Sequence, residues 1–199
     1  MARLVTTDFS NNAEPCVLRY TTVDNTMLEF KDDAFDAEII SHTYKNGEGV
    51  VIFNKSITSI GDYAFRYCDS ITMVSIPDSV VKIGNYAFNY CSLLANIVIP
   101  PSVKSIGNEA FQNCSSLTSI TIPSSVISIE RGAFSRCRNL TDVTILSNIT
   151  SIKSWTFAHC KNLKNVTIPD SISKIEWWAF HRCPNLSNAV IEKILRIEE

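Results

Sequence analysis

The sequence has no hydrophobic run long enough to cross a membrane. About 20 consecutive apolar residues are needed for that, and polar or charged residues interrupt every apolar stretch much earlier. Basic residues are not in excess either, because 18 lysines and arginines are offset by 20 aspartates and glutamates, for a net charge of −2. The chain therefore lacks the electrostatic signature of a nucleic-acid-binding protein. We expect neither nucleic acid nor insertion into a membrane.

Residues 1–15 lack the apolar segment of a secretory signal peptide. Two interpretations stay open. The protein is not exported by that route, as for an intracellular or phage-borne protein, or a signal has been removed from it.

Catalytic and metal-binding motifs are missing as well. The chain has no nucleophile elbow, no phosphate-binding loop and no paired-carboxylate pattern. Its acidic residues do not recur in register as in calcium-binding repeats, and no two of its seven cysteines form a Cys-x-x-Cys pair. We predict no enzyme activity, no cofactor and no metal site. The histidines, His42, His159 and His181, are expected at the surface; zinc binding with Cys160 or Cys183 is the alternative.

What the sequence does contain is one motif in six copies. Ala-Phe-x-x-Cys, with threonine in place of alanine once, ends at a cysteine each time, and successive cysteines are 23 residues apart (for example 91 − 68). A constant period of this length is typical of a solenoid, in which each repeat forms one turn. The six cysteines, which we expect as buried free thiols, are Cys68, Cys91, Cys114, Cys137, Cys160 and Cys183. Cys16, the seventh, is the one expected to be reactive, if any is.

Each repeat also carries the pattern of a short strand. Aliphatic residues stand six and eight positions after the cysteine, as at Ile120 and Ile122, and alternate with polar or small residues. This period of two predicts a strand with one buried face. A proline such as Pro123 follows in four repeats and ends the strand, because it cannot donate a ladder hydrogen bond. Serines two positions further on, such as Ser125, are expected to bind backbone groups of the turn.

The full repeat, Ile-x-x-Ile-Gly-x-x-Ala-Phe-x-x-Cys-x-x-Leu-x-x-Ile-x-Ile-Pro-x-Ser-Val, resembles the BspA-like (Treponema pallidum type) class of leucine-rich repeats over about residues 57–191. The resemblance implies a right-handed leucine-rich repeat solenoid, with parallel strands on a concave face and short turns, 3-10 turns or helical turns on the convex face. It also implies surface or secreted proteins of bacteria and some protozoan parasites, which act in adhesion and protein binding and have no catalytic centre.

One position departs from that pattern in the later repeats. Glycine stands there in the first three repeats only, and charged residues replace it afterwards. Glycine is therefore not obligatory, and we predict a backbone φ below zero at this position. The six residues are Gly61, Gly84, Gly107, Glu130, Lys153 and Glu176.

We divide the chain into three parts: an N-terminal cap with a β-hairpin and a degenerate half-repeat (1–56), the repeat array (57–191) and a C-terminal tail (192–199). In the cap, residues 16–23 are predicted as a strand, and Asn46-Gly47 marks a hairpin. Ala34-Phe35 repeats part of the motif, and residues 48–60 are in register with the second half of a repeat. The alternative for this region is a separate ligand-binding module.

The tail shows no polar cap. An open end exposes a strand edge and an apolar layer. Self-association through the C-terminal end and truncation of a longer parent therefore stay open.

Two surfaces are candidate binding sites. The first, called here the front strand row, comprises the residues five and seven positions after each cysteine, most of them short and uncharged: Met73, Ser75, Asn96, Val98, Ser119, Thr121, Asp142, Thr144, Asn165, Thr167, Asn188 and Val190. Solenoids bind through such extended faces, although a merely solvated face has the same composition. The second is an aromatic row five positions before the cysteines, with one neighbour: Tyr63, Tyr86, Trp155, Trp177 and Trp178. These rings are either interface residues or pack across convex turns.

Basic residues gather in the later repeats, at Arg131, Arg136, Arg138, Lys161, Lys164, Lys174 and Arg182. One interpretation is that these residues form a solvated face. The alternative is that they bind an acidic partner or a glycan. Together these features predict a non-enzymatic protein-interaction module, a surface adhesin or ligand-binding repeat domain that binds a protein or glycan through its concave sheet. Family resemblance favours the cell surface or the extracellular space. The alternative is a structural spacer or assembly unit of a cell envelope or phage particle, without a ligand of its own.

Overall fold

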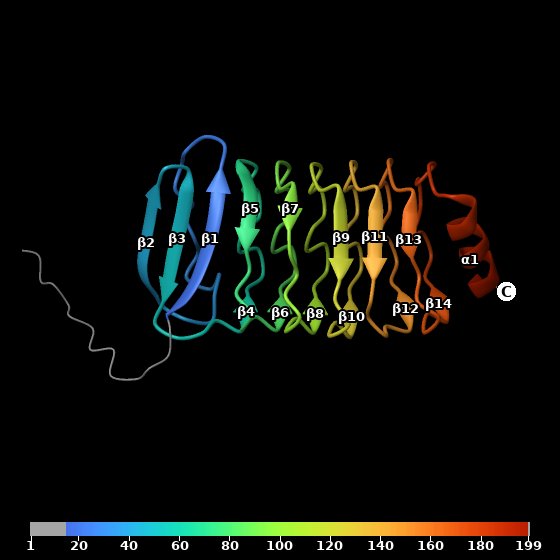
Figure 1. The fold of residues 1–199 in the computed structure, drawn as a ribbon, viewed down its shortest axis with the longest axis horizontal. Helices are drawn as coiled ribbons and strands as arrows, with labels where there is room; N and C mark the ends of the chain where they lie inside the picture. The colour runs from blue at the N-terminus through green and yellow to red at the C-terminus, as the bar shows by residue number, and fades with distance from the viewer. Residues whose placement is uncertain (1–14, 199) are drawn as a thin grey trace, which may run out of the picture.

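The repeats form a solenoid of parallel strands in which each turn stacks on the one before it. The computed structural model describes residues 15–198, so the predicted absence of a signal peptide concerns residues almost wholly outside the described part of the chain. In Figure 1 the turns follow one another along the longest axis, between a β-rich cap and a single helix. The predicted repeat solenoid with 23-residue spacing is confirmed, since equivalent residues of neighbouring turns pair with one another.

The predicted strands of the first five repeats form the front ladder. It comprises β5 (Ile71–Ser75) and β7 (Asn96–Ile97), which pair with each other, and β9 (Ser119–Ile122), β11 (Asp142–Ile145) and β13 (Asn165–Thr167), which pair in a second group. Thr121, Thr144 and Thr167 lie opposite one another in register, as do Ile120, Val143 and Val166 beneath them. The second set is buried and the first is not, which is the alternation that the sequence predicts.

A second ladder of two-residue strands runs along the other side of the turns, which the sequence did not predict. Its strands are β4 (Ser59–Ile60), β6 (Lys82–Ile83), β8 (Ser105–Ile106), β10 (Ser128–Ile129), β12 (Ser151–Ile152) and β14 (Lys174–Ile175). The first four strands pair from turn to turn, as Ile83 with Ile106, and β12 pairs separately with β14. Two residues are too short to show a strand period, so only the recurring isoleucine was visible in the sequence.

The core is organised by a stack of phenylalanine rings. Phe88, Phe111 and Phe134 lie parallel within 3°, with ring centroids 5.1 and 5.2 Å apart. Phe65, Phe157 and Phe180 extend the same stack. All but Phe180, which is half-buried, are fully buried. Each turn thus closes the apolar layer of its neighbours, as a solenoid requires.

The repeat cysteines line the core beside this stack. From Cys91 to Cys183 each thiol donates a hydrogen bond to the carbonyl oxygen of the phenylalanine 26 residues earlier, at 3.0–3.2 Å. All six are free thiols in the described chain, as predicted, and all but the half-buried Cys68 are buried. Burial raises the pKa of the Cys137 thiol to about 12. The cysteine therefore ties each turn to the previous one, a role that its sequence spacing alone did not reveal.

The turns opposite the front ladder contain two left-handed residues each. They stand five positions and one position before each cysteine, with φ between 51° and 67°. Gly132 is the one glycine among these twelve residues. At the glycine position predicted to have negative φ, none of the three glycines has a positive φ, so that prediction is confirmed. Close approach matters there instead, because a Cβ on Gly107 would lie 2.6 Å from the backbone nitrogen of Asn85.

The cap continues the front ladder. Its strands are β1 (Cys16–Thr22), β2 (Ile39–Lys45) and β3 (Glu48–Phe53), and β1 pairs antiparallel with both β3 and β5. Asn46 and Gly47 form the predicted two-residue hairpin turn, with φ of 53° and 84°. The Gly61 N–H donates a hydrogen bond to the Ala34 carbonyl at 2.8 Å. Within the array, the Gly84 N–H donates in the same way to the Ile60 carbonyl of the preceding turn.

The C-terminal end differs from the prediction. Helix α1 (Asn188–Glu198) covers it and packs against β13 and β14, so the expected open end is closed on this side. Val190, Ile194 and Ile197 recur at helical spacing and turn toward the core. Because Asn188 and Val190 lie in α1, they do not extend the front strand row, and Val190 is buried. No helix in residues 15–198 has the length and apolar character needed to span a membrane.

Candidate binding surfaces

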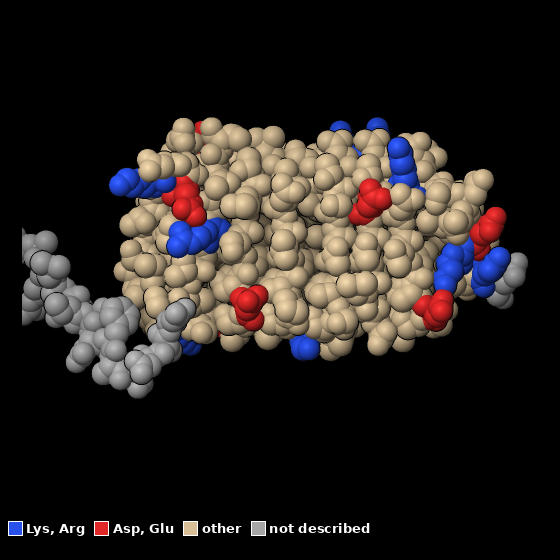
Figure 2. Space-filling view, viewed as in Figure 1, with Lys and Arg blue, Asp and Glu red and all other residues tan. Residues whose placement is uncertain are grey.

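The front strand row, without Asn188 and Val190, forms a continuous exposed face. Met73 pairs with Asn96, and Ser119, Asp142 and Asn165 lie opposite one another in the ladder. Figure 2 shows that charged side chains are sparse over β5 to β13 and gather mainly over the cap and near α1. Depletion of charge is a feature of protein-interface cores.

Val98 is the most exposed apolar residue of this face. Its side chain is 78% exposed. It lies between two shallow hollows, one of about 390 Å³ with Met73 and Pro100, and one of about 360 Å³ with Thr121 and Leu146. The face therefore has an apolar ridge at its N-terminal half, flanked by space for side chains of a partner.

Asp142 is the single acidic member of the row. Its carboxylate accepts hydrogen bonds from the Thr141 hydroxyl at 2.6 Å and from the Asn165 amide at 2.8 Å. These two bonds, the first above all, lower the pKa of Asp142. The carboxylate is thus ionised and held by its neighbours, and the C-terminal half of the row is the more polar one.

The N-terminal part of the aromatic row is a ring stack on the turns. Tyr63 and Tyr86 lie parallel within 2°, with centroids 5.1 Å apart. Tyr67 and Tyr90, one position before their cysteines, lie beside them at 5.1 Å from each other. The Arg66 guanidinium stands over this cluster, 4.6 Å from the Tyr67 ring. The sequence missed Tyr67 and Tyr90, although their equal distance from the cysteine was a usable signal.

The C-terminal part brings together four rings, which we call the Trp–His cluster: Trp155, His159, Trp178 and His181. The Trp155 centroid lies 4.9 Å from that of Trp178 and 5.9 Å from that of His181, and the two histidines are 5.6 Å apart. Aromatic rings in this range attract one another edge to face. The predicted aromatics therefore pack across the turns and remain partly exposed.

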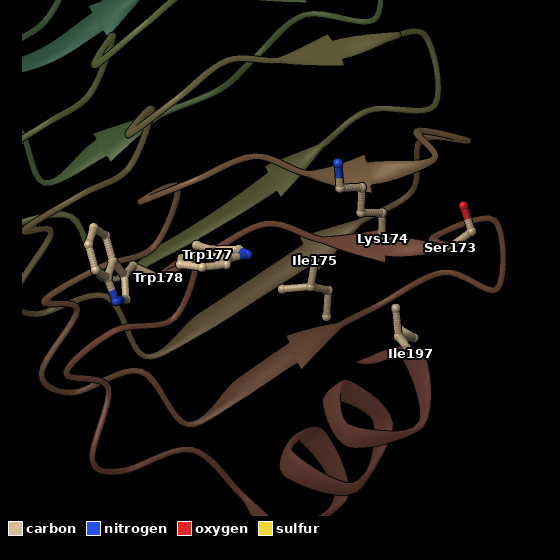
Figure 3. Close-up of a pocket in the computed structure, with 6 residues that line it drawn as sticks. All are labelled: Ser173, Lys174, Ile175, Trp177, Trp178 and Ile197. Atoms are coloured by element: carbon tan, nitrogen blue, oxygen red, sulfur yellow. The ribbon is translucent and has the colours of Figure 1, made fainter. Parts of the chain in front are cut away.

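Trp177 does not join that cluster. It is 80% exposed and lines a groove of about 510 Å³ together with Ile175 and Ile197. Figure 3 shows this groove between β14 and α1.

The histidines differ from one another in environment. His42, expected at the surface, is half-buried, with Nε2 2.8 Å from the Tyr20 hydroxyl. Burial lowers the pKa of His42. The pKa of His159 is also lowered, by burial first and then by the charges of Arg136 and Arg182. Within the described residues no three histidine, cysteine or acidic side chains converge as metal ligands.

Comparison with known families gives a clear match to the repeat. The model of the BspA type leucine-rich repeat region matches in six copies, over residues 37–150 and 81–199. The chain belongs to the BspA-type leucine-rich repeat family. The resemblance seen in the sequence is therefore confirmed. A comparison with curated proteins found no match.

Solved structures of bacterial leucine-rich repeat proteins share the fold. A leucine-rich cell surface protein from Faecalibacterium prausnitzii is 30% identical, with a TM-score of 0.60, 79% of this chain covered and 47% of that one. A Bacteroides ovatus leucine-rich repeat protein is 32% identical, with a TM-score of 0.50 and coverage of 72% and 42%. The T. pallidum leucine-rich repeat protein is 27% identical, with a TM-score of 0.61 and coverage of 73% and 79%. The chain thus spans less than half the length of the first two relatives.

Proposed function

We propose that this BspA-type repeat protein is a non-enzymatic protein-interaction module that binds a protein partner through the front strand row from Met73 to Thr167. One observation carries the proposal: a contiguous, solvent-exposed strand face with few charges and an apolar ridge at Val98. Solenoids present this kind of extended surface to partners.

The hollows beside Val98 support the same surface. A partner that inserts apolar side chains beside Met73 and Leu146 covers exposed hydrophobic area at about 25 cal/mol per Å². The exposed threonines of β9 and β13 add hydrogen-bond donors and acceptors without the desolvation cost of a charge. The polar half near Asp142 then orients the partner.

We further propose that the protein acts as a surface or extracellular adhesin. The support is the description of the F. prausnitzii relative as a cell surface protein. Labelling of intact cells of the source organism with an antibody against the chain tests this location.

The binding surface is tested with two matched variants. Val98→Glu places a carboxylate on the front face, where the native side chain is 78% exposed, and Ile127→Glu does the same off that face, where the side chain is 75% exposed. Binding of the purified chain to extracellular matrix proteins and mucins is measured by surface plasmon resonance, with circular dichroism as a check of folding.

We expect Val98→Glu, and a Thr121/Thr144/Thr167→Glu variant, to abolish binding, while Ile127→Glu leaves it unchanged. Equal loss in both single variants, or none in either, would contradict the proposed face. Absence of binding together with end-to-end self-association would favour the spacer or assembly role.

A further inference from the structure

The turns of the last three repeats carry an aromatic and basic surface that the proposed protein-binding face does not use. It is centred on the Trp–His cluster, in which Trp178 is 55% exposed. The side chains of Arg136, Lys161 and Arg182 are exposed around it. Each of these cations lies close enough to His159 to lower the pKa of its imidazole.

These cations have no ion-pair partner among the described residues. The salt bridges there join Arg19 to Glu48, Lys153 to Glu176 and Lys193 to Asp170. The second lies two residues before Trp155 and Trp178, and it pairs neither Arg136, Lys161 nor Arg182. Cations without a counter-charge that gather on one surface attract anions. The surface therefore combines exposed ring faces with an excess of positive charge.

A small hollow adjoins the cluster. It measures about 170 Å³ and is lined by Glu109, Arg131, Gly132, Arg136, Trp155 and His159 among others. Gly132 has a φ of 67° at a position where the other five repeats carry a side chain. The Glu109 side chain lies against this glycine, since a Cβ there would be 3.1 Å from Glu109 Cγ, so the hollow holds one carboxylate beside two arginines and Trp155.

We infer that the Trp–His cluster, with Arg136 and Arg182, is a binding site for an acidic carbohydrate, a polysaccharide that carries carboxylate or sulfate groups. The C–H faces of sugar rings stack on exposed aromatic rings such as Trp178. The planar guanidinium fork of arginine donates paired hydrogen bonds to carboxylate or sulfate oxygens.

The spacing of the turns favours a carbohydrate over an acidic peptide. Trp155 and Trp178, in successive turns, pack edge to face at 63° with centroids 4.9 Å apart, and the half-exposed Trp178 leaves ring surface free for a sugar. Side chains on one face of an extended peptide recur every two residues, about 6.6 Å, so they fall out of register with turns stacked about 4.8 Å apart. Cations recur along the same axis, at Arg136, Lys161 and Arg182 in three successive repeats.

The experiment measures binding of the whole chain to heparin and to polygalacturonate, as sulfated and carboxylated probes, by isothermal titration calorimetry. Dextran serves as the neutral carbohydrate and poly-glutamate as the acidic peptide. The test variants are Trp178→Ala and Arg136→Gln/Arg182→Gln. Trp177→Ala is the matched aromatic control, since this neighbour lies outside the cluster, and Lys104→Gln/Lys174→Gln is the charge-matched control.

We expect binding of heparin or polygalacturonate, and weakening by about tenfold or more in each test variant, equivalent to ~1.4 kcal/mol. The two control variants should bind the acidic polysaccharides as tightly as the native chain. Dextran and poly-glutamate should not bind the native chain. The inference is overturned if neither acidic polysaccharide binds the folded chain, if Trp178→Ala binds as tightly as the native protein, or if poly-glutamate binds as well as the polysaccharides. Because Val98→Glu should leave this binding unchanged, the result is independent of the proposed protein-binding face.

Discussion

Replacement of Phe111 by alanine should be among the most destabilising single changes in the array. The ring is fully buried and is sandwiched between Phe88 and Phe134, with centroids 5.1 and 5.2 Å away. The substitution removes stacking on both faces and leaves a cavity that two neighbouring turns share. A buried phenylalanine replaced by alanine costs about 3–5 kcal/mol in free energy of unfolding.

The same change at the end of the stack should cost less. Phe180 is half-buried and stacks on Phe157 alone, 5.4 Å away. Since solenoid stability is a sum over neighbouring turns, we expect Phe180→Ala to cost roughly half as much as Phe111→Ala. Phe111→Leu keeps most of the apolar volume and should cost less than ~1.5 kcal/mol.

Urea denaturation followed by far-ultraviolet circular dichroism measures these differences. The three variants are compared with the native chain under one set of conditions. A cost below ~1 kcal/mol for Phe111→Ala, well under the range for buried aromatics, would refute the reasoning. So would equal costs at Phe111 and Phe180, because the ring stack would then not be the element that couples the turns.

Three further predictions concern other parts of the core. Cys137→Ala removes the hydrogen bond from the thiol to the Phe111 carbonyl and should lower the free energy of unfolding, measured by urea denaturation, by about 1–2 kcal/mol. Cys137→Ser keeps a hydrogen-bond donor and should lower it less. The Ser147 hydroxyl is buried with no hydrogen-bond partner, so Ser147→Ala should raise the melting temperature or leave it unchanged; a clear decrease would contradict this. Burial holds the pKa of His42 below its ordinary value, so the unfolded chain binds more protons and stability should fall as pH drops below about 6.5; pH-dependent melting of His42→Gln should lack this component.

The array was readable from the sequence because each of its turns repeats the same physical solution. Buried isoleucines alternate with exposed residues in β9 and β11, and the phenylalanine recurs at one place in every turn. The serine interpretation is confirmed too, since the Ser125 hydroxyl donates to the Val103 carbonyl at 2.8 Å. These features are local or recur with the 23-residue period, so the spacing of residue types along the sequence is enough to predict them.

The features that the sequence missed depend on contacts between turns or on a change of period. The hydrogen bond from the Cys114 thiol to the Phe88 carbonyl joins residues that are 26 positions apart. This separation is longer than one repeat, so the pattern within a repeat does not reveal it. Helix α1 was missed because Asn188 and Val190 fit the strand register of earlier repeats, while the helical spacing of Val190, Ile194 and Ile197 competes with it.

The candidate sites were predicted only in part. The strand positions placed the front row correctly up to Thr167. The Trp–His cluster was not visible, because His159 and His181 occupy different positions within their repeats and meet Trp155 only through the fold. Whether either surface binds a partner stays a prediction.

The central claim is that a protein partner binds the front strand row, and methyl-detected nuclear magnetic resonance of the 22.2 kDa chain tests it most directly. Met73, Val98 and Leu146 carry exposed methyl groups around the proposed face, and Ile127 and Leu195 carry exposed methyl groups elsewhere. On addition of a bound partner, we predict shifts at Met73, Val98 and Leu146 with the other two unchanged. Shifts confined to Ile127 or Leu195, with the three front methyl groups unmoved, would contradict the account.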